Sequence, residues 1–340
     1  MGGHALRTTL SQYARRVCEA SLEGLPVLLE SIALGCKVIA EATKTAGLSD
    51  SRGGAGTQNI QGEEQKKLDV ISNDVLLDTL SKSGNVAVIV SEENELPIFT
   101  DNKTTGKYGV VLDPMDGSSN IDCAIPVGTI FGVYELLPGS LGTQEDVLQA
   151  GEKMICAGYC LYGSSTVLVV SLGVGVVGFT LDTVLGEFVL SHPSISTPDK
   201  GCVYSINEGN SSTWDAGLPD QPTLKYVNLC KVPKDGGPPK SLRYIGSMVG
   251  DVHRTLLYGG VFIYPADKKS PKGKLRMLYE CFPMAFLVTQ AGGAATDGTM
   301  PILQKIPNGI HERSPICLGS KIDVQEYVEL FSSAQSSAKM

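Results

Sequence analysis

The chain has 340 residues, of which 42% are hydrophobic and 19% charged, and its formal net charge is −8. This length exceeds the usual limit for a single hydrophobic core, so we expect two domains, and the acidic balance argues against a nucleic-acid partner. No apolar stretch is long enough to cross a bilayer, and residues 1–7 lack a secretory signal's apolar segment; removal of a transit peptide before Met1 stays open.

The N-terminal part of the chain has a helical pattern. Apolar residues recur at helical spacing from Leu25 to Ala40, which predicts a long amphipathic helix within a largely helical stretch of the first 46 residues. Residues 47–63 are rich in Gly, Ser, Thr and Asn and are predicted to be a mobile linker, or a lid if they lie beside a site. A second helix is expected from Glu63 to about Ser83.

Two predicted buried strands each run into acidic residues. Val86–Val90 is followed by Glu92 and Glu93, and Tyr108–Leu112 is followed by the segment Asp113-Pro114-Met115-Asp116-Gly117-Ser118-Ser119. Proline cannot donate to a sheet ladder, so we expect the second strand to end at Asp113. Each acidic segment alone could be an ordinary solvated turn. Carboxylates gathered at one sheet edge would repel each other, however, and Mg²⁺ or Mn²⁺ with oxygen ligands would remove that repulsion.

The remaining pattern predicts an α/β fold with many tight turns, in keeping with 39 glycines and one tryptophan. Strands are expected over Pro126–Leu136, Met154–Val170, Val174–Leu181 and Gly186–Leu190, and polar residues 191–200 are a plausible domain boundary. The second half begins with a strand at Val203; an exposed loop is expected at 232–240, helices at Val249–Leu257 and Met277–Ala291, and a strand at Val261–Tyr264.

Two compositional features remain. Residues 268–276 concentrate five cationic side chains in an acidic protein, which indicates either a solvated basic loop or a phosphate pocket. The nine cysteines are scattered among apolar residues without C-x-x-C spacing, so we expect reduced, mostly buried thiols and no zinc site or disulfide framework.

Together these motifs resemble the fructose-1,6-bisphosphatase family from about Leu22 to Phe331. The short D-P-x-D-G core is shared with inositol-type monophosphatases and indicates only the superfamily. The extension Ser118-Ser119-Asn120-Ile121-Asp122 and the loop Lys269-Ser270-Pro271-Lys272-Gly273-Lys274 narrow it to the bisphosphatases. Further marks are Lys66-Lys67-Leu68-Asp69, Ser91-Glu92-Glu93, Tyr204–Gly209, Arg243–Met248 and Leu278-Tyr279-Glu280.

The resemblance implies a layered α-β-α-β-α sandwich with an N-terminal allosteric-type domain, residues 1–195, and a C-terminal substrate domain, residues 196–340. It implies hydrolysis of the 1-phosphate of fructose 1,6-bisphosphate by a homotetramer. Implied metal-binding positions are Glu92, Glu93, Asp113, the Met115 carbonyl, Asp116 and Glu280. Asp69, Glu93 and Glu63 match catalytic positions. Substrate-binding positions are Gly117, Ser118, Ser119, Asn207, Arg243, Tyr244, Met248, Tyr264 and Lys274, with Arg243 reaching a neighbouring subunit's substrate.

The chain departs from the family pattern in several places. Glu63 stands where many members have Asp, and Asn210 replaces a tyrosine that contacts the distal phosphate. AMP-inhibited members have a Gly-Thr-Gly-Glu-like helix start; here the matching residues 21–26 have Leu22 and Pro26 at the threonine positions. Lys107-Tyr108 is kept, but Glu135 replaces an arginine, so we expect AMP insensitivity.

The compartment and the substrate leave alternatives. Plant-like segments at 61–65 and 311–315 indicate a plastid isoform in the chloroplast stroma or, alternatively, a cytosolic one. Residues 136–152 lack the cysteine-bearing insertion of the redox-controlled plastid form, so thioredoxin control by that route is not expected. A sedoheptulose-1,7-bisphosphatase would use the same chemistry with a roomier pocket. A non-catalytic sugar-phosphate sensor would lack some of the carboxylates, and none is missing.

Overall fold

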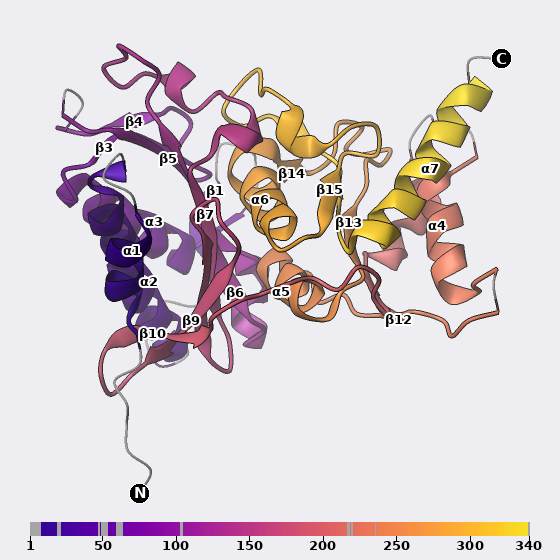
Figure 1. The fold of residues 1–340 in the computed structure, drawn as a ribbon, viewed down its shortest axis with the longest axis horizontal. Helices are drawn as coiled ribbons and strands as arrows, with labels where there is room; N and C mark the ends of the chain where they lie inside the picture. Colours follow the sequence, from indigo (N-terminus) through magenta and orange to yellow (C-terminus); the bar gives the residue numbers. More distant parts are fainter. Residues whose placement is uncertain are drawn as a thin grey trace, which may run out of the picture.

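The computed structural model describes residues 8–18, 22–46, 48, 54–58, 64–102, 105–215, 218, 220–234 and 236–338. Figure 1 shows five layers: helices α1–α3, a large sheet, helices α5 and α6, a smaller sheet, and helices α4 and α7. The expected α-β-α-β-α sandwich with two domains is confirmed. None of the helices within these ranges is long and apolar enough to cross a membrane.

The large sheet forms the centre of the N-terminal domain and has the strand order β10-β9-β8-β7-β6-β5-β3-β4. Its members are antiparallel neighbours except for β3 and β5, which run parallel. The strands are β3 (Val86–Ser91), β4 (Ile98–Phe99), β5 (Tyr108–Asp116), β6 (Val127–Glu135), β7 (Cys156–Tyr162), β8 (Thr166–Ser171), β9 (Val177–Asp182) and β10 (Glu187–His192).

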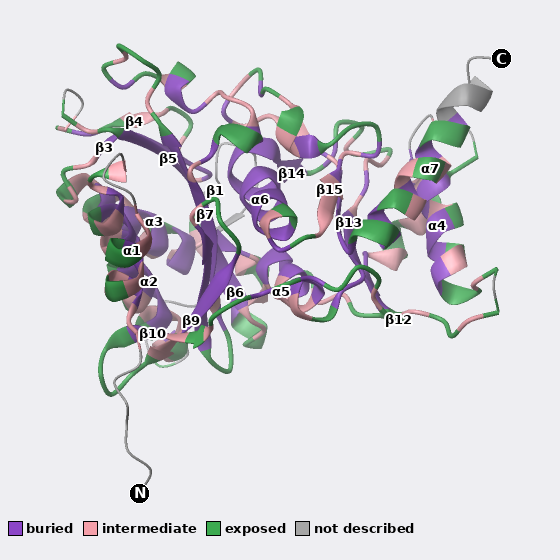
Figure 2. Ribbon diagram, in the orientation of Figure 1, coloured by how far each residue is buried: buried purple, intermediate pink, exposed green. Residues whose placement is uncertain are grey.

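Both faces of this sheet are covered, which explains why its central strands are apolar throughout. All nine residues of β5 are buried (Figure 2). Val110 and Leu112 face the core under α1 (Leu10–Val17), α2 (Leu25–Thr45) and α3 (Lys67–Lys82), whereas Val111 faces the core shared with α6 (Phe282–Gln290). Since successive side chains of a strand alternate between faces, a strand buried on both sides reads as a continuous apolar run.

The smaller sheet, of order β12-β11-β13-β17-β15, belongs to the C-terminal domain. Helix α5 (Met248–Tyr258) and α6 lie between the two sheets, and α4 (Pro222–Lys231) and α7 (Lys321–Ala338) cover the outer face. The strands are β11 (Val203–Ser205), β12 (Ser241–Leu242), β13 (Val261–Tyr264), β15 (Ala294–Thr296) and β17 (Ile316–Gly319), and a separate ladder joins β14 (Leu275–Arg276) to β16 (Arg313–Ser314).

The expected linker at 47–63 was wrong in part. Residues Gly54–Gln58 form β1, which pairs antiparallel with β2 (Glu64–Lys66), so helix α3 begins at Lys67 rather than at Glu63. The two strands stabilise each other through a ladder between segments that are individually polar, and such pairing leaves no hydrophobic periodicity in the sequence.

The prediction that Pro114 ends its strand was also wrong. Strand β5 continues to Asp116, which pairs with Gly128 of β6, and the ladder register shifts between Asp113 and Asp116. A proline is tolerated at such a bulge because the missing N–H falls where the ladder is interrupted.

The predicted helix Met277–Ala291 has two parts. Met277–Cys281 forms a π-helical turn, and the regular helix α6 begins at Phe282. Pro283 cannot donate an N–H to the preceding turn, and wide turns of this kind are frequent at functional sites. Glu280 therefore lies on a locally distorted segment, where its side chain is buried rather than on a helix surface.

The expectation that most thiols are buried is confirmed for the described residues. All nine thiols are free, and six of them are buried; Cys18 is half-buried, and Cys123 and Cys202 are exposed. The boundary between residues 195 and 196 stays a prediction.

Candidate active site

The two acidic segments lie side by side because their strands are the parallel pair of the large sheet. Ser91 of β3 pairs with Leu112 of β5, and the Glu92 backbone N–H donates to the Leu112 carbonyl at 3.1 Å. Glu92 and Asp113 are thus adjacent at the carboxyl ends of neighbouring parallel strands. This is the position where open α/β sheets bind ligands, and the expected meeting of the two segments is confirmed.

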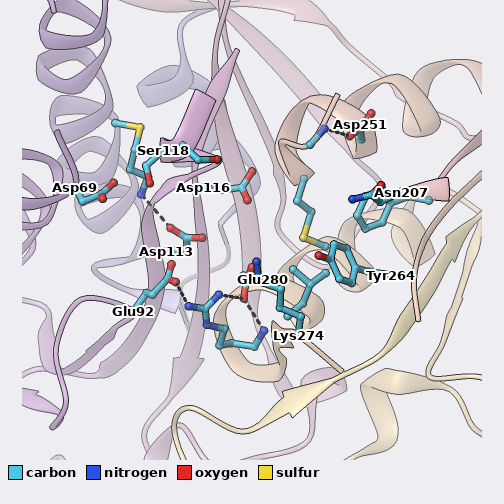
Figure 3. A pocket seen from close by; sticks show the side chains of 18 of the residues that line it. Asp69, Glu92, Asp113, Asp116, Ser118, Asn207, Asp251, Tyr264, Lys274 and Glu280 are labelled. Carbon is cyan, nitrogen blue, oxygen red and sulfur yellow. Dashed lines mark hydrogen bonds and ion pairs between the residues drawn. The ribbon is translucent and has the colours of Figure 1, made fainter. Parts of the chain in front are cut away.

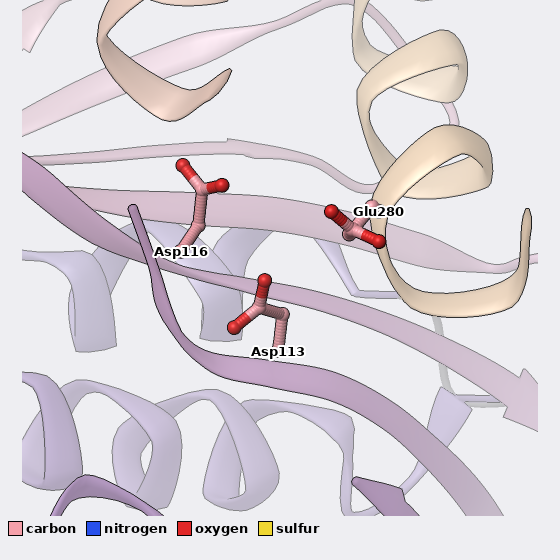
Figure 4. A group of neighbouring side chains, drawn as sticks. All are labelled: Asp113, Asp116 and Glu280. Carbon is pink, nitrogen blue, oxygen red and sulfur yellow. The ribbon is translucent and has the colours of Figure 1, made fainter. Parts of the chain in front are cut away.

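Three carboxylates from two domains converge at this edge. Asp113, Asp116 and Glu280 each present an oxygen within 4.8 Å of the others, and all three residues are buried (Figure 4). Burial raises the pKa of Asp113 well above its usual range, and the charges of Glu92 and Asp116 add to the rise. Burial likewise raises the pKa of Asp116 to about 7, against the hydrogen bond from the Val249 N–H.

The donor set fits a hard divalent cation. Buried carboxylate oxygens this close to each other are unfavourable when ionised, and a cation with oxygen ligands would compensate them. The Met115 N–H donates to Asp113 Oδ1 at 3.0 Å, so the backbone folds around the carboxylate that precedes it. Glu93 also lines the cavity in front of this cluster.

Arg276 supplies positive charge at the same edge. Its guanidinium contacts the Glu92 carboxylate and lies 3.7 Å from Glu280 Oε2, and its backbone N–H donates to Glu280 at 2.5 Å. Burial raises the pKa of Glu92, and this guanidinium opposes the rise. Arg276 is only 4% exposed, so it belongs to the site and not to a solvated loop.

Asp69 lies on the first turn of α3, facing the same cavity. Its carboxylate accepts a hydrogen bond from the Lys66 N–H at 2.7 Å, which fixes it at the helix start. Burial raises its pKa to about 7, against the Lys66 hydrogen bond, and the charge of Glu93 adds to the rise. A carboxylate with such a pKa can accept a proton near neutral pH. Glu63, the other expected catalytic acid, lies outside the described residues.

A glycine turn leads from the carboxylates into a short 3₁₀ segment, Ser118–Cys123. Gly117 has φ +79°, and a Cβ there would lie 2.9 Å from the Ser247 side chain, so only glycine fits. The turn's first internal hydrogen bond runs from the Asn120 N–H to the Gly117 carbonyl at 2.8 Å. The backbone N–H groups before Asn120 have no partner among the described residues of the turn. Together with the Ser118 and Ser119 hydroxyls, they are suited to binding an anion.

All these groups line one cavity of about 650 Å³, a size typical of small-molecule sites. Across it from Asp69 and Asp113 lie Asn207 and Tyr264, and Lys274 projects beside them (Figure 3). Tyr244 and Met248 also line the cavity. The side with Asp69 and Asp113 is therefore strongly acidic, and the opposite side offers a cation, a phenol and an amide, with Asp251 near Asn207.

Most residues expected at the site line this cavity. They are Asp69, Glu92, Glu93, Asp113, Met115, Asp116, Gly117, Ser118, Ser119, Asn207, Tyr244, Met248, Tyr264, Lys274 and Glu280. Arg243 does not: it is exposed, and its guanidinium donates to the Leu242 carbonyl at 2.8 Å. Asn210 is exposed as well.

Sequence reasoning assigned no site role to Lys66 or Asp251, and it placed Arg276 only in a basic stretch with two open interpretations; all three line the cavity. For Arg276 a signal was present, because it stands four residues before Glu280, a spacing at which opposite charges can meet on a helix. Asp251 accepts hydrogen bonds from the Ile245 and Gly246 N–H groups at 3.1 and 3.2 Å, a contact that only the folded loop reveals.

Comparison with known proteins places the whole chain in one group. A sequence model described as the N-terminal domain of fructose-1-6-bisphosphatase matches residues 8–193, and one described as the C-terminal domain matches residues 197–332. A protein of Brassica napus named cytosolic fructose-1,6-bisphosphatase is 59% identical over 305 residues, covering 90% of this chain and 88% of the relative. One of Spinacia oleracea with the same name is 54% identical, covering 99% of both.

A solved structure agrees with these sequence matches. The holo form of Leishmania major fructose-1,6-bisphosphatase superposes with a TM-score of 0.90 at 42% identity. The match covers 95% of this chain and 98% of that one, so the likeness extends over both sheets and the cavity between them.

Proposed function

Since the chain belongs to the fructose-1,6-bisphosphatase family, a group of phosphoric-monoester hydrolases, we propose that it hydrolyses the 1-phosphate of fructose 1,6-bisphosphate to give fructose 6-phosphate and phosphate. The observation that carries the proposal is the polarity of the cavity. Buried carboxylates gather at one side, Tyr264 and Lys274 lie across from Asp69 and Asp113, and Tyr244 also lines the cavity. A substrate with a phosphate at each end fits this arrangement.

Divalent cations, with Mg²⁺ or Mn²⁺ as candidates, would be held by Glu92, Glu93, Asp113, the Met115 carbonyl, Asp116 and Glu280. Bound there, they would neutralise phosphate charge and lower the pKa of an attacking water. The protein supplies the remaining functions. The amides and hydroxyls of Gly117, Ser118 and Ser119 would hold the transferred phosphate, while Asp69 and Glu93 accept the proton of the water.

The second phosphate and the sugar would bind at the far wall. Lys274, Tyr244 and Tyr264 offer hydrogen-bond donors to a phosphate, and Asn207 and Met248 would contact the sugar phosphate as well. Binding remote from the reacting bond orients the substrate for attack. Arg243 is exposed away from this chain's own cavity, which supports a role at a neighbouring subunit's substrate in a homotetramer.

AMP insensitivity is part of the proposal. The Glu23 carboxylate forms an ion pair with Lys107 at 2.8 Å, and the Tyr108 hydroxyl donates to the Glu23 carbonyl at 3.0 Å. Both residues that the family resemblance assigns to a nucleotide are thus engaged by Glu23, and the acidic Glu135 lies on the partner strand opposite Tyr108. To bind Lys107, a nucleotide phosphate would have to displace the Glu23 carboxylate, and the negative charge of Glu135 would oppose its binding.

The compartment proposed is the cytosol. Relatives from Brassica napus, Spinacia oleracea and Arabidopsis thaliana are named as cytosolic enzymes. These names support the cytosolic alternative rather than the chloroplast stroma.

One steady-state assay tests the activity. We expect purified protein to release phosphate from fructose 1,6-bisphosphate only when Mg²⁺ or Mn²⁺ is present, with a much lower kcat/KM for sedoheptulose 1,7-bisphosphate. Equal or higher kcat/KM on the heptulose would reassign the substrate, and absence of phosphate release with both cations would refute the hydrolase proposal.

A further inference from the structure

A single histidine from the C-terminal domain reaches the turn that follows β3. His311 Nε2 lies 3.1 Å from the Asn94 carbonyl oxygen and 3.3 Å from the Glu95 carbonyl oxygen. On the other side of its ring, Nδ1 lies 2.9 Å from the hydroxyl of Tyr279. These contacts connect segments more than 180 residues apart in the chain, one from each domain.

The direction of the bonds follows from the partners. Carbonyl oxygens only accept, so Nε2 carries the proton, and Nδ1 of the neutral ring then accepts from the Tyr279 hydroxyl. Burial lowers the pKa of His311, which keeps the ring neutral, although the two carbonyl contacts oppose the shift. The ring is therefore held in one orientation from both sides.

The two segments joined in this way carry the carboxylates of the candidate cation site. Glu92 and Glu93 immediately precede Asn94, and Glu280 immediately follows Tyr279. From the opposite side, α3 holds the same turn: Asn73 Nδ2 donates to Asn94 Oδ1 at 2.9 Å, and the Ser91 hydroxyl donates to Asn73 Oδ1 at 2.7 Å. The α3 contacts stay within the N-terminal domain, whereas His311 connects the turn to the Glu280 segment.

Arg276 also bridges Glu92 and Glu280, but it contacts their carboxylates directly. A cation bound by those carboxylates would compete with the guanidinium for the same oxygens. Among the described residues, the hydrogen bonds of His311 join it to two main-chain carbonyls and a phenol and not to these carboxylates, so they are compatible with a bound cation. Outer contacts of this kind orient ligands and commonly affect metal affinity as strongly as about 10- to 100-fold.

We propose that His311 is a positioning residue that fixes the Glu92–Glu93 turn relative to Glu280 and thereby sets the affinity of the site for divalent cations. The inference rests on the proposed function, since it concerns the same site. It assigns His311 no contact with substrate and no proton transfer.

The chain contains a matched control. His253 on α5 contacts the hydroxyl of Tyr159 on β7 through Nδ1 at 2.7 Å, and this pair also joins the two domains. The ring pairs are alike: centroids lie 5.8 Å apart at 85° for Tyr159–His253 and 5.9 Å apart at 74° for Tyr279–His311. Both histidines are half-buried and neither is among the described residues that line the cavity, but it is His311 that contacts the turn following Glu92 and Glu93.

The test measures Mn²⁺ binding to the full-length chain without substrate, from the loss of the free Mn²⁺ electron paramagnetic resonance signal. We expect His311→Phe to weaken binding about 10- to 100-fold, and His253→Phe to leave it unchanged. In the assay, His311→Phe should raise the Mn²⁺ concentration for half-maximal activity, with little change in the KM for the bisphosphate. Unchanged Mn²⁺ affinity in His311→Phe, or equal weakening in His253→Phe, would overturn the proposal.

Two polar replacements separate the hydrogen bond from packing. The side-chain amide of His311→Gln places its nitrogen near the position of Nε2 and should restore most of the affinity, whereas His311→Asn is too short to reach the carbonyls and should not. Equal affinities for these two variants would also overturn the proposal, even if His311→Phe failed to fold. Absence of Mn²⁺ binding by the unmodified protein would instead refute the cation site of the proposed function.

Discussion

The Asp116 carboxylate accepts a hydrogen bond from the backbone N–H of Val249 at 2.8 Å, and the Ser247 hydroxyl lies 3.4 Å from the same oxygen. Val249 is the second residue of α5, so a carboxylate of the large sheet caps a helix that packs against the smaller sheet. The positive end of the helix dipole favours the ionised form of Asp116 in spite of its burial. The same residue therefore contributes to the cation cluster and to the contact between the domains.

Replacing Asp116 should separate these two roles. In Asp116→Asn the side-chain amide oxygen can still accept the hydrogen bond from the Val249 N–H, so we expect the fold to remain. Turnover should be lost, with kcat lower by about 10²- to 10³-fold or more. Phosphate release at saturating Mg²⁺ measures the loss, and circular dichroism checks the fold. Near-normal activity would contradict the assignment, and Asp182→Asn, at the exposed end of β9, serves as control.

The stability of the cation-free protein should fall as pH rises. Burial raises the pKa of Asp69 and of Asp116 to about 7 in the folded protein, above the ordinary value of 3.8. Such groups contribute stability that is complete below the unfolded pKa and is lost as pH rises through the folded pKa. In a chelator, Tm should therefore decrease between about pH 5 and pH 7.

Added Mg²⁺ should reverse that trend, because cation binding requires the ionised carboxylates and releases their protons. We expect a larger rise in Tm on adding Mg²⁺ at pH 8 than at pH 6. A chelator-treated protein whose Tm increases from pH 5 to pH 7 would show that these carboxylates are already ionised and compensated.

Arg276→Met should destabilise the cation-free protein. Removing a buried cation beside Glu92 and Glu280 leaves carboxylates without compensation, at a cost of about 3–5 kcal/mol in the free energy of unfolding. Denaturant titration in a chelator measures the loss, and Mg²⁺ should restore part of it. The control is Lys200→Met, which removes an exposed ion pair with Glu326 and should cost at most about 1 kcal/mol. Similar losses in both variants would contradict the compensating role of Arg276.

Gly117→Ala tests the close approach at the phosphate turn. Both Gly117 (φ +79°) and Gly139 (φ +80°) have left-handed backbone, but only at Gly117 would a Cβ meet another side chain, 2.9 Å from Ser247. Gly139→Ala therefore isolates backbone strain, about 1 kcal/mol. We expect Gly117→Ala to destabilise the protein further and to raise the KM for the bisphosphate; equal stability losses and unchanged kinetics would refute the contact.

AMP should inhibit weakly or not at all, because Glu23 already engages Lys107. Inhibition measured across an AMP titration checks this, and a micromolar inhibition constant would contradict it. Glu23→Gln should increase AMP binding by releasing the lysine. Glu30→Gln, which removes a comparable surface ion pair with Arg15, should not.

Local patterns were enough to predict most central strands, because β3 and β5 are buried on both faces and read as apolar runs. Local patterns gave the wrong prediction where strand pairing or backbone geometry, and not residue composition, determined the structure. The polar strands β1 and β2 stabilise each other, the bulge accommodates Pro114, and the π-turn before Pro283 places Glu280 inside the site. Helix α7 was not predicted, although its apolar residues Val324, Tyr327 and Phe331 recur at helical spacing and are buried.

The amino-acid sequence by itself determined the chemistry: which strands end in carboxylates, where a glycine turn offers amides, and which loop carries lysines. Tertiary structure alone decided how those groups combine. Asp116 caps a helix of the other domain, Arg276 lies between Glu92 and Glu280, and His311 holds the turn beyond Glu93. These contacts join residues over 130 positions apart, or depend on a π-turn, so their energies arise from burial and distance, which no local pattern encodes.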